Sequence, residues 1–483
     1  NVNEVERSFK LHCCSKLRDF VFKYEDLLGK EIWDVLDEEI QQDPGAFLSA
    51  INSYASRKGN LPIYLLIDEY DNFTNTILST YGTEYYQKAT HGEGFVRGFF
   101  NVIKAATTGT GSALQRMFIT GVSPVTMDDV TSGFNIGTNI TTDPWFNDLV
   151  GFSEAELREM LTYYKEQGVL MQTVDETIVM MKPNYDNYCF SEEKLAQCMF
   201  NSDMALYFMK SFVLHHVKPK EIVDPNIRTD FNKLAYLIRL DHGLGENFSV
   251  IKEIAEQGEI TTDIATHFSA LEMTDVRNFK SLLFYFGLLS IKGVDMVGRP
   301  ILHVPNLVVR EQLFSFLIRG YIKHDIFKID MNRMTMLFEN MAFRGDWKPL
   351  FNFIAEAIRE QSRIREYIEG EAHIKGFLLA YLGMYRYYQL YPEYELNKGF
   401  ADFLFKPSPS VPVMPPLTYL LEVKYAKAGA SEKEIRALAD EAREQLLRYS
   451  QDELVAEAKA KGGLKLITIV WCSWELVLLE EVL

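Results

Sequence analysis

The chain has 483 residues, of which 47% are hydrophobic and 24% charged, and its formal net charge is −17. These values indicate a folded protein of two to four domains and argue against a disordered chain. The negative charge argues against nonspecific coating of nucleic acid, although it still permits a local basic cleft or a metal-bridged phosphate. The longest apolar run, 282–291, is too short to cross a membrane and no leader opens the chain. We therefore expect a cytoplasmic protein without a membrane partner.

The N-terminal part, 1–150, begins with helical periodicity over 5–57 and then changes pattern. The run LPIYLLIDEYDNF (61–73) is continuously apolar until acids close it, which predicts a strand buried on both faces of a parallel sheet. A second such strand is expected in MFITGVSP (117–124). The stretch Gly94–Ala106 is long enough for a crossover helix between them. Together these elements predict a βαβ unit.

The segment 151–245 is expected to be mostly helical and aromatic-rich. Ser153 and Glu156 stand three residues apart before an amphipathic pattern, which is the signature of a capping box at a helix start. No chemistry is evident in this segment.

The segment 246–329 is expected to form three helices and then a hairpin, with KGVDMVGRP (292–300) as its turn. This order resembles a winged helix. A packing role is favoured over DNA reading, because the expected third helix carries only Arg277 and Lys280 as basic residues.

The last part, 330–483, is expected to begin with long helices and to continue as hairpin, strand, helix and strand. The hairpin is YELNKGFADFLF (394–405), and a proline-rich loop follows it. TYLLEVKY (418–425) and LKLITIVWC (464–472) read as strands. Ser431 and Glu434 form a capping box at the start of the helix between them.

Two acids and a lysine in this part could carry chemistry. Residues two apart in a strand share a face, so Glu422 and Lys424 should point the same way while Val423 enters the core. If the hairpin pairs with this strand, Asp402 and Glu422 converge on one divalent cation, Mg²⁺ or Mn²⁺. Such a cation polarises a phosphodiester and activates water, and Lys424 would stand beside both. A plain buried ion pair is the alternative.

The order of these elements resembles the PD-(D/E)XK nuclease superfamily, which implies a restriction-endonuclease-like α/β domain. The resemblance assigns metal binding to Asp402 and Glu422 and a catalytic role to Lys424. It also assigns support of the site to Gln445 and Tyr449 in the following helix, and an acid on the first helix to Glu371. One departure is that Gly399-Phe400-Ala401-Asp402 lacks the arginine that relatives often carry before the aspartate.

In the N-terminal part, Asp68 and Glu69 end an apolar strand and look like a Walker B motif, in which the Asp holds Mg²⁺ and the Glu activates water. The later stretch FITGVSPVTMDDVTSGFNIGTNIT resembles the sensor region of the bacterial AAA-ATPase-like family that is commonly fused to a PD-(D/E)XK domain. The resemblance implies a P-loop-NTPase-like parallel sheet and places Thr120 at the sensor position.

The sequence contains no G-x-x-x-x-G-K-[ST] phosphate loop. We expect that loop to lie upstream of Asn1, so that the sheet is N-terminally truncated and ATP is a cofactor only if the loop exists there.

The sequence thus predicts an α/β multidomain protein, with an AAA-ATPase-like module, a helical and winged-helix-like middle and a C-terminal nuclease-like domain. The expected activity is metal-dependent hydrolysis of nucleic acid, with DNA as the favoured substrate, under regulation by the ATPase-like module. The alternative is a non-catalytic nucleotide-regulated scaffold or switch. Whether the chain forms a homo-oligomer stays open.

Overall fold

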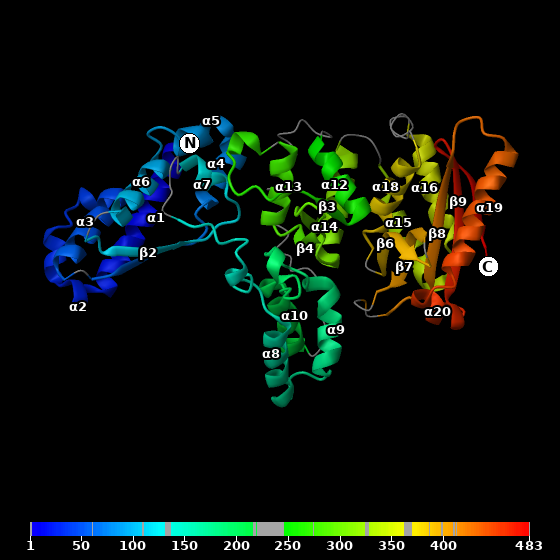
Figure 1. Cartoon of the computed structure of the whole chain (residues 1–483), viewed down its shortest axis with the longest axis horizontal. Helices are drawn as coiled ribbons and strands as arrows, with labels where there is room; N and C mark the ends of the chain where they lie inside the picture. The colour runs from blue at the N-terminus through cyan, green and yellow to red at the C-terminus, as the bar shows by residue number, and fades with distance from the viewer. Residues whose placement is uncertain are drawn as a thin grey trace. The chain divides into compact units, whose positions relative to one another are not determined.

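The computed structural model describes residues 2–59, 61–108, 111–130, 137–215, 219, 246–273, 275–323, 328–361, 370–385, 387–397, 399–408, 411 and 413–482. The chain divides into two compact units (Figure 1). The first unit combines Asn1–Asp143 with Asp263–Gly287, and the second combines Pro144–Thr262 with Leu288–Leu483. The domain boundaries at 150, 245 and 329 stay predictions.

The first unit is built from helices around a pair of parallel strands. Strand β1 (Ile63–Ile67) pairs with β2 (Leu114–Ile119), and helix α6 (Phe95–Thr108) precedes β2. The predicted βαβ order is therefore confirmed. The other elements of this unit are α1 (Val2–Lys23), α2 (Glu25–Leu28), η1 (Lys30–Asp34), η2 (Ile40–Gln42), α3 (Pro44–Arg57), α4 (Asn72–Tyr81), α5 (Thr83–Thr90), α7 (Val125–Val130), η6 (Ala270–Glu272) and α13 (Val276–Tyr285).

The prediction that β1 is buried on both faces is wrong. Tyr64 is 63% exposed and Leu66 is 74% exposed, and Phe118 on β2 is 42% exposed. These side chains stay open because, among the described residues, the sheet has two strands and nothing covers this face of it. A P-loop-like architecture stays a prediction for this unit.

The second unit begins with a helical segment that packs around its own apolar core. Helix α8 (Glu154–Glu166) starts at Ser153, whose capping box with Glu156 is formed as predicted. The other elements of this segment are η3 (Pro144–Phe146), α9 (Val174–Tyr185), η4 (Glu192–Lys194) and α10 (Ser202–His215). The rest of the predicted helical segment, 216–218 and 220–245, lies outside the described residues.

A three-stranded antiparallel sheet follows, with the order β3-β5-β4. Its strands are β3 (Glu259–Thr261), β4 (Ser290–Val294) and β5 (Pro300–His303), and they follow helix α12 (Glu246–Gln257) along the chain. The predicted hairpin is confirmed, with its turn between β4 and β5. The winged-helix interpretation of 246–329 stays a prediction.

The C-terminal part is a five-stranded mixed sheet with the order β10-β9-β8-β7-β6. Strands β8 and β9 are parallel, and the other neighbours are antiparallel. The strands are β6 (Tyr388–Leu396), β7 (Gly399–Pro407), β8 (Thr418–Ala426), β9 (Leu464–Cys472) and β10 (Glu475–Glu481). The helices are α14 (Leu307–Lys323), α15 (Met331–Arg344), α16 (Lys348–Glu360), α18 (Glu371–Leu382), α19 (Glu432–Tyr449) and α20 (Glu453–Ala460).

Helices cover both faces of this sheet (Figure 1). On one face, Leu446 and Tyr449 of α19 join a buried cluster with Leu404 and Leu420. On the other face, the Tyr419 hydroxyl donates to the carbonyl of Met341 in α15 at 2.7 Å. Because residues of a strand alternate between faces, Glu422 and Lys424 share the α19 face with Leu420. The α/β fold predicted for this part is confirmed.

Among the described residues, no helix combines the length and the hydrophobicity needed to cross a membrane.

Candidate active site

The hairpin and the following strand bring two carboxyl groups together in the interior. Strands β7 and β8 are antiparallel with Phe403 opposite Leu421, and the same register continued by one residue sets Asp402 opposite Glu422. The main-chain N–H of Val423 donates to Asp402 Oδ2 at 2.6 Å. The two acids are 6% and 2% exposed, respectively. Asp402 and Glu422 therefore lie side by side on the two strands, and their convergence on a divalent cation stays a prediction.

One oxygen of Glu422 faces a cation and the other has no partner. Its Oε2 lies 3.8 Å from Lys424 Nζ, and its buried Oε1 has no hydrogen-bond partner. Burial raises the pKa of Glu422 to about 9; the nearby Asp402 carboxylate adds to this shift and Lys424 opposes it. Without a cation, Glu422 therefore holds its proton near neutral pH, and a cation that reaches Oε1 would displace that proton.

Lys375 in α18 is a second cation of the site, and the sequence interpretation missed it. Its ammonium is ion-paired with Asp402 Oδ1 and lies 2.9 Å from Glu371 Oε1 and 3.1 Å from Glu393 Oε1. Burial alone would lower the pKa of Lys375, but Asp402 and Glu371 raise it above its ordinary value. The predicted acid Glu371 thus joins the site through Lys375. The four-residue spacing of Glu371 and Lys375 on one helix was the available signal.

Helix α19 supplies further polar groups above Lys424. Glu441, also missed, lies with its Oε1 3.2 Å from Lys424 Nζ. Gln445 follows one helical turn later on the same face, and its Oε1 is buried without a partner. On the neighbouring strand, Thr468 is opposite Glu422 and its buried Oγ1 also lacks a partner. Buried oxygens usually find a hydrogen-bond partner in native proteins, so Glu422, Gln445 and Thr468 each retain an acceptor that could take one.

Tyr449, the other predicted member of this helix, lies in the core. It is 2% exposed within the cluster under α19, and its hydroxyl accepts from Arg448 at 3.3 Å. A Cβ at Gly399 would come within 2.7 Å of the Tyr449 ring, so this glycine lets the ring pack against the start of β7. The contacts of Tyr449 are with the hydrophobic core and not with the carboxylates.

The residues present fit a hard divalent cation that is held partly by water or substrate. Among the described residues, no group of three or more His, Cys, Asp and Glu side chains is arranged to hold a metal ion. Asp402 and Glu422 nevertheless offer carboxylate oxygens, and Glu422 Oε1 lacks a partner. Mg²⁺ is commonly held by one or two carboxylates while waters and phosphate oxygens complete its shell.

In the first unit, the three predicted nucleotide-site residues lie together where β1 and β2 end. Thr120 Oγ1 donates to Asp68 Oδ1, and the main-chain N–H of Glu69 donates to Thr120 Oγ1 at 3.4 Å. Glu69 has a φ of 52°, an uncommon conformation for a non-glycine residue. Asp68 and Glu69 are exposed. Ligand sites in parallel α/β sheets lie at this carboxyl edge.

Asp71, two residues beyond Glu69, is an acid that the sequence interpretation passed over. It is 1% exposed, and its carboxylate accepts from the main-chain N–H groups of Val122 and Ser123 at 3.2 and 3.3 Å. Asn75 Nδ2 donates to it at 3.0 Å. Asp71 therefore ties together the segments that follow β1 and β2, which is a structural role.

Comparison with known proteins assigns the two ends of the chain. Residues 1–131 match the model of the AAA-ATPase-like family, described as a predicted AAA-ATPase, and residues 369–481 match the model of the PD-(D/E)XK nuclease superfamily. No curated protein and no solved structure matches the chain. The second match spans the five-stranded sheet and every residue of the carboxylate site described above. The chain therefore joins an AAA-ATPase-like domain to a PD-(D/E)XK nuclease superfamily domain.

Proposed function

We propose that the C-terminal domain hydrolyses phosphodiester bonds of nucleic acid, with DNA as the favoured substrate and Mg²⁺ or Mn²⁺ as cofactor. Asp402 and Glu422 hold the cation, which when bound polarises the phosphate and lowers the pKa of water. Lys424 lies beside Glu422 and orients the attacking water or stabilises negative charge on the phosphate. Glu441 holds the ammonium group of Lys424, and Gln445 supports the site one helical turn further along α19. Glu371 keeps Lys375 in place.

The observation that carries this proposal is the unpaired Oε1 of Glu422. It is buried next to a second carboxylate, while Lys424 lies near the other oxygen. A structural ion pair would not require an oxygen without a partner. Leaving a buried acceptor unsatisfied costs about 1–3 kcal/mol, and a bound cation removes that cost.

The test compares the wild-type chain with Glu422→Gln, which preserves shape and removes the charge. Both are incubated with single- and double-stranded DNA and RNA in Mg²⁺, in Mn²⁺ and in EDTA. We expect wild type to cleave with metal only, and Glu422→Gln to lose cleavage and Mn²⁺ binding together. Glu457→Gln removes an exposed carboxylate paired with Lys461 and serves as the control, which should behave as wild type. Cleavage by Glu422→Gln at the wild-type rate would contradict the proposal.

One observation favours the second candidate, a non-catalytic scaffold. Lys375 already neutralises Asp402, so that the site could be a closed ion-pair network in which an ammonium replaces the metal. In that case neither Mg²⁺ nor Mn²⁺ would bind to the wild-type chain at millimolar concentration, and no nucleic acid would be cut.

We also propose that Asp68, Glu69 and Thr120 form the Mg²⁺ side of a nucleotide site that regulates the nuclease. The contact between Thr120 and Asp68 supports this proposal, because it joins the ends of two parallel strands at the edge where such ligands bind. Because the chain contains no phosphate loop, we expect at most weak binding of Mg-ATP, and titration at millimolar Mg-ATP tests whether that binding depends on Asp68. Binding to wild type that Asp68→Asn weakens would support the proposal, and equal binding to both would contradict it.

A further inference from the structure

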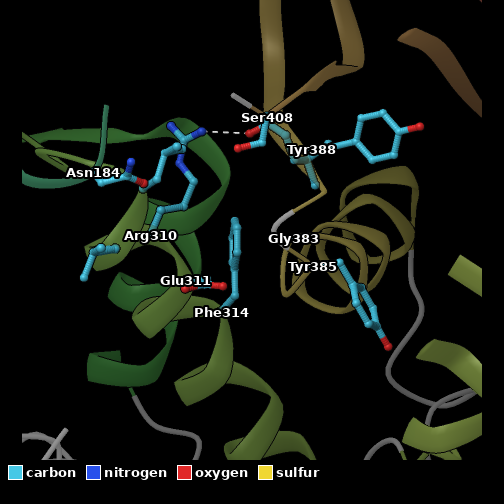
Figure 2. Close-up of a pocket in the computed structure, with 11 residues that line it drawn as sticks. Asn184, Arg310, Glu311, Phe314, Gly383, Tyr385, Tyr388 and Ser408 are labelled. Atoms are coloured by element: carbon cyan, nitrogen blue, oxygen red, sulfur yellow. Dashed lines mark hydrogen bonds between the residues drawn. The ribbon is translucent and has the colours of Figure 1, made fainter. Parts of the chain in front are cut away.

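Arg310 lines a pocket in the second unit (Figure 2). The pocket lies between α14 and the part of the chain that includes Gly383 after α18 and Tyr388 on β6. It is separate from the carboxylate site, since Asp402, Glu422 and Lys424 do not line it. Phe314 and Leu390 give it apolar walls, and Asn184, Arg310, Glu311 and Ser408 add polar groups.

Arg310 uses little of its hydrogen-bonding capacity within the protein. One guanidinium nitrogen donates to the carbonyl of Leu390 at 2.7 Å, and the guanidinium carbon lies 5.7 Å from the centre of the Tyr391 ring. Among the residues that the structure describes, no carboxylate pairs with Arg310 and its other guanidinium nitrogens have no acceptor. Arg310 is half-buried, and burial lowers the pKa of its guanidinium because a charged group loses hydration when it is buried. A desolvated cation is costly unless an anion reaches it.

The surroundings of the guanidinium suit an oxyanion. Figure 2 shows Arg310 extending from α14 toward Ser408, with Asn184 beside it. The Glu311 carboxylate points toward a different part of the pocket, and α14 separates consecutive side chains by roughly 100°. The guanidinium fork matches the oxygen spacing of phosphate and carboxylate, and phosphate offers it more acceptor oxygens.

The size of the cavity limits the ligand. Its volume is about 40 Å³. At roughly 10–15 Å³ for each water, this is room for about three water molecules and hence for one phosphate group, but not for a whole nucleotide.

We propose that this pocket binds a phosphate group, either free inorganic phosphate or the terminal phosphate of a monoester, with the Arg310 guanidinium as its main contact. The pocket touches the ends of α18 and β6, and these elements also carry Lys375 and Glu393 of the carboxylate site. Phosphate in the pocket would link α14 to the elements that position that site. The proposal does not depend on nuclease activity.

The test is calorimetric titration of the full chain, without divalent metal and with EDTA present, at constant ionic strength. Wild type should bind sodium phosphate, and Arg310→Met should bind it roughly tenfold or more weakly, as expected for loss of a charged hydrogen-bond donor. Arg310→Lys keeps the charge but loses the planar fork, so it should bind with intermediate affinity. It also provides a second variant if Arg310→Met does not fold. Arg299→Met removes an exposed arginine paired with Asp295 and should bind phosphate as wild type does.

A second ligand, adenosine monophosphate, separates the two sources of phosphate. Stronger binding of adenosine monophosphate than of phosphate supports a monoester terminus, whereas binding of inorganic phosphate alone supports the free ion. Three results would overturn the proposal. The first is that wild type at millimolar concentration binds no phosphate when phosphate is in roughly tenfold molar excess. The second is that Arg310→Met binds phosphate as tightly as wild type does, and the third is that wild type binds acetate as tightly as phosphate.

Discussion

The ammonium group of Lys375 is ion-paired with Asp402 Oδ1, so a cation from α18 already occupies one side of the carboxylate that we propose as a metal ligand. The same lysine contacts Glu371 and Glu393, which hold it in place. A divalent ion that enters the site must therefore approach against this charge or displace it.

Removing Lys375 should strengthen metal binding. We expect Lys375→Met to bind Mn²⁺ at least roughly tenfold more tightly than wild type, because a like charge within a few ångströms costs several kcal/mol at the effective dielectric of a protein. Calorimetric titration with Mn²⁺ measures this. Lys465→Met, which removes a lysine paired with Glu481 elsewhere in the sheet, is the control and should leave the affinity unchanged. Weaker Mn²⁺ binding by Lys375→Met would show that the lysine supports the metal ligands instead.

The raised pKa of Glu422 predicts how stability depends on pH in the absence of metal. Its pKa is raised from an ordinary value of 4.5 to about 9 in the folded chain. Between these values the folded state holds a proton that the unfolded state has released, so the free energy of unfolding falls as the pH rises. Glu422→Gln cannot ionise and should lose this part of the pH dependence. Urea unfolding of both proteins at pH 5, 7 and 8.5 measures it, and parallel pH curves for wild type and variant would contradict the assignment.

Metal binding should show the corresponding dependence. Because the cation binds the ionised carboxylate, Mn²⁺ affinity should rise with pH through this range, and each binding event should release protons. Titrations in buffers of different ionisation enthalpy count those protons. If Glu422→Gln releases as many protons on Mn²⁺ binding as wild type does, the group that titrates is not Glu422.

Asp68 and Asp71 should respond differently to removal. Asp71→Ala strands two main-chain N–H groups in the interior and should lower the free energy of unfolding by roughly 1–3 kcal/mol. Asp68→Ala removes an exposed carboxylate and should cost only about 0.5 kcal/mol. Urea unfolding of the two variants provides the comparison. An equal loss for both would mean that Asp68 is structural and would weaken its assignment to a ligand site.

The sequence predicted the C-terminal fold well because its signals are local. Capping boxes at Ser153 and Ser431, the hairpin before Asp402 and the apolar strands all depend on short-range geometry, and each is present in the structure. The pairing of Asp402 with Glu422 followed from that order once β7 and β8 were taken as neighbours.

The rest depended on tertiary packing, which no local pattern reports. Lys375 reaches Asp402 because α18 packs against the sheet. Glu441 reaches Lys424 because α19 packs against β8, the strand that carries Lys424. Likewise, the apolar run in β1 predicts burial, but Leu66 is exposed because exposure depends on what covers a sheet and not on the strand itself.

The most direct test of the central claim, that the C-terminal domain is a metal-dependent nuclease, is the cleavage rate of Lys424→Ala measured beside its melting temperature. We predict that this variant cuts DNA about 10²- to 10⁴-fold more slowly than wild type in Mn²⁺, while its melting temperature stays nearly unchanged and its Mn²⁺ affinity does not fall. Lys465→Ala is the matched control and should cut at the wild-type rate. If wild type cuts no nucleic acid and Lys424→Ala loses roughly 3–5 kcal/mol of stability, Lys424 and Glu422 form a structural ion pair and the nuclease account is contradicted.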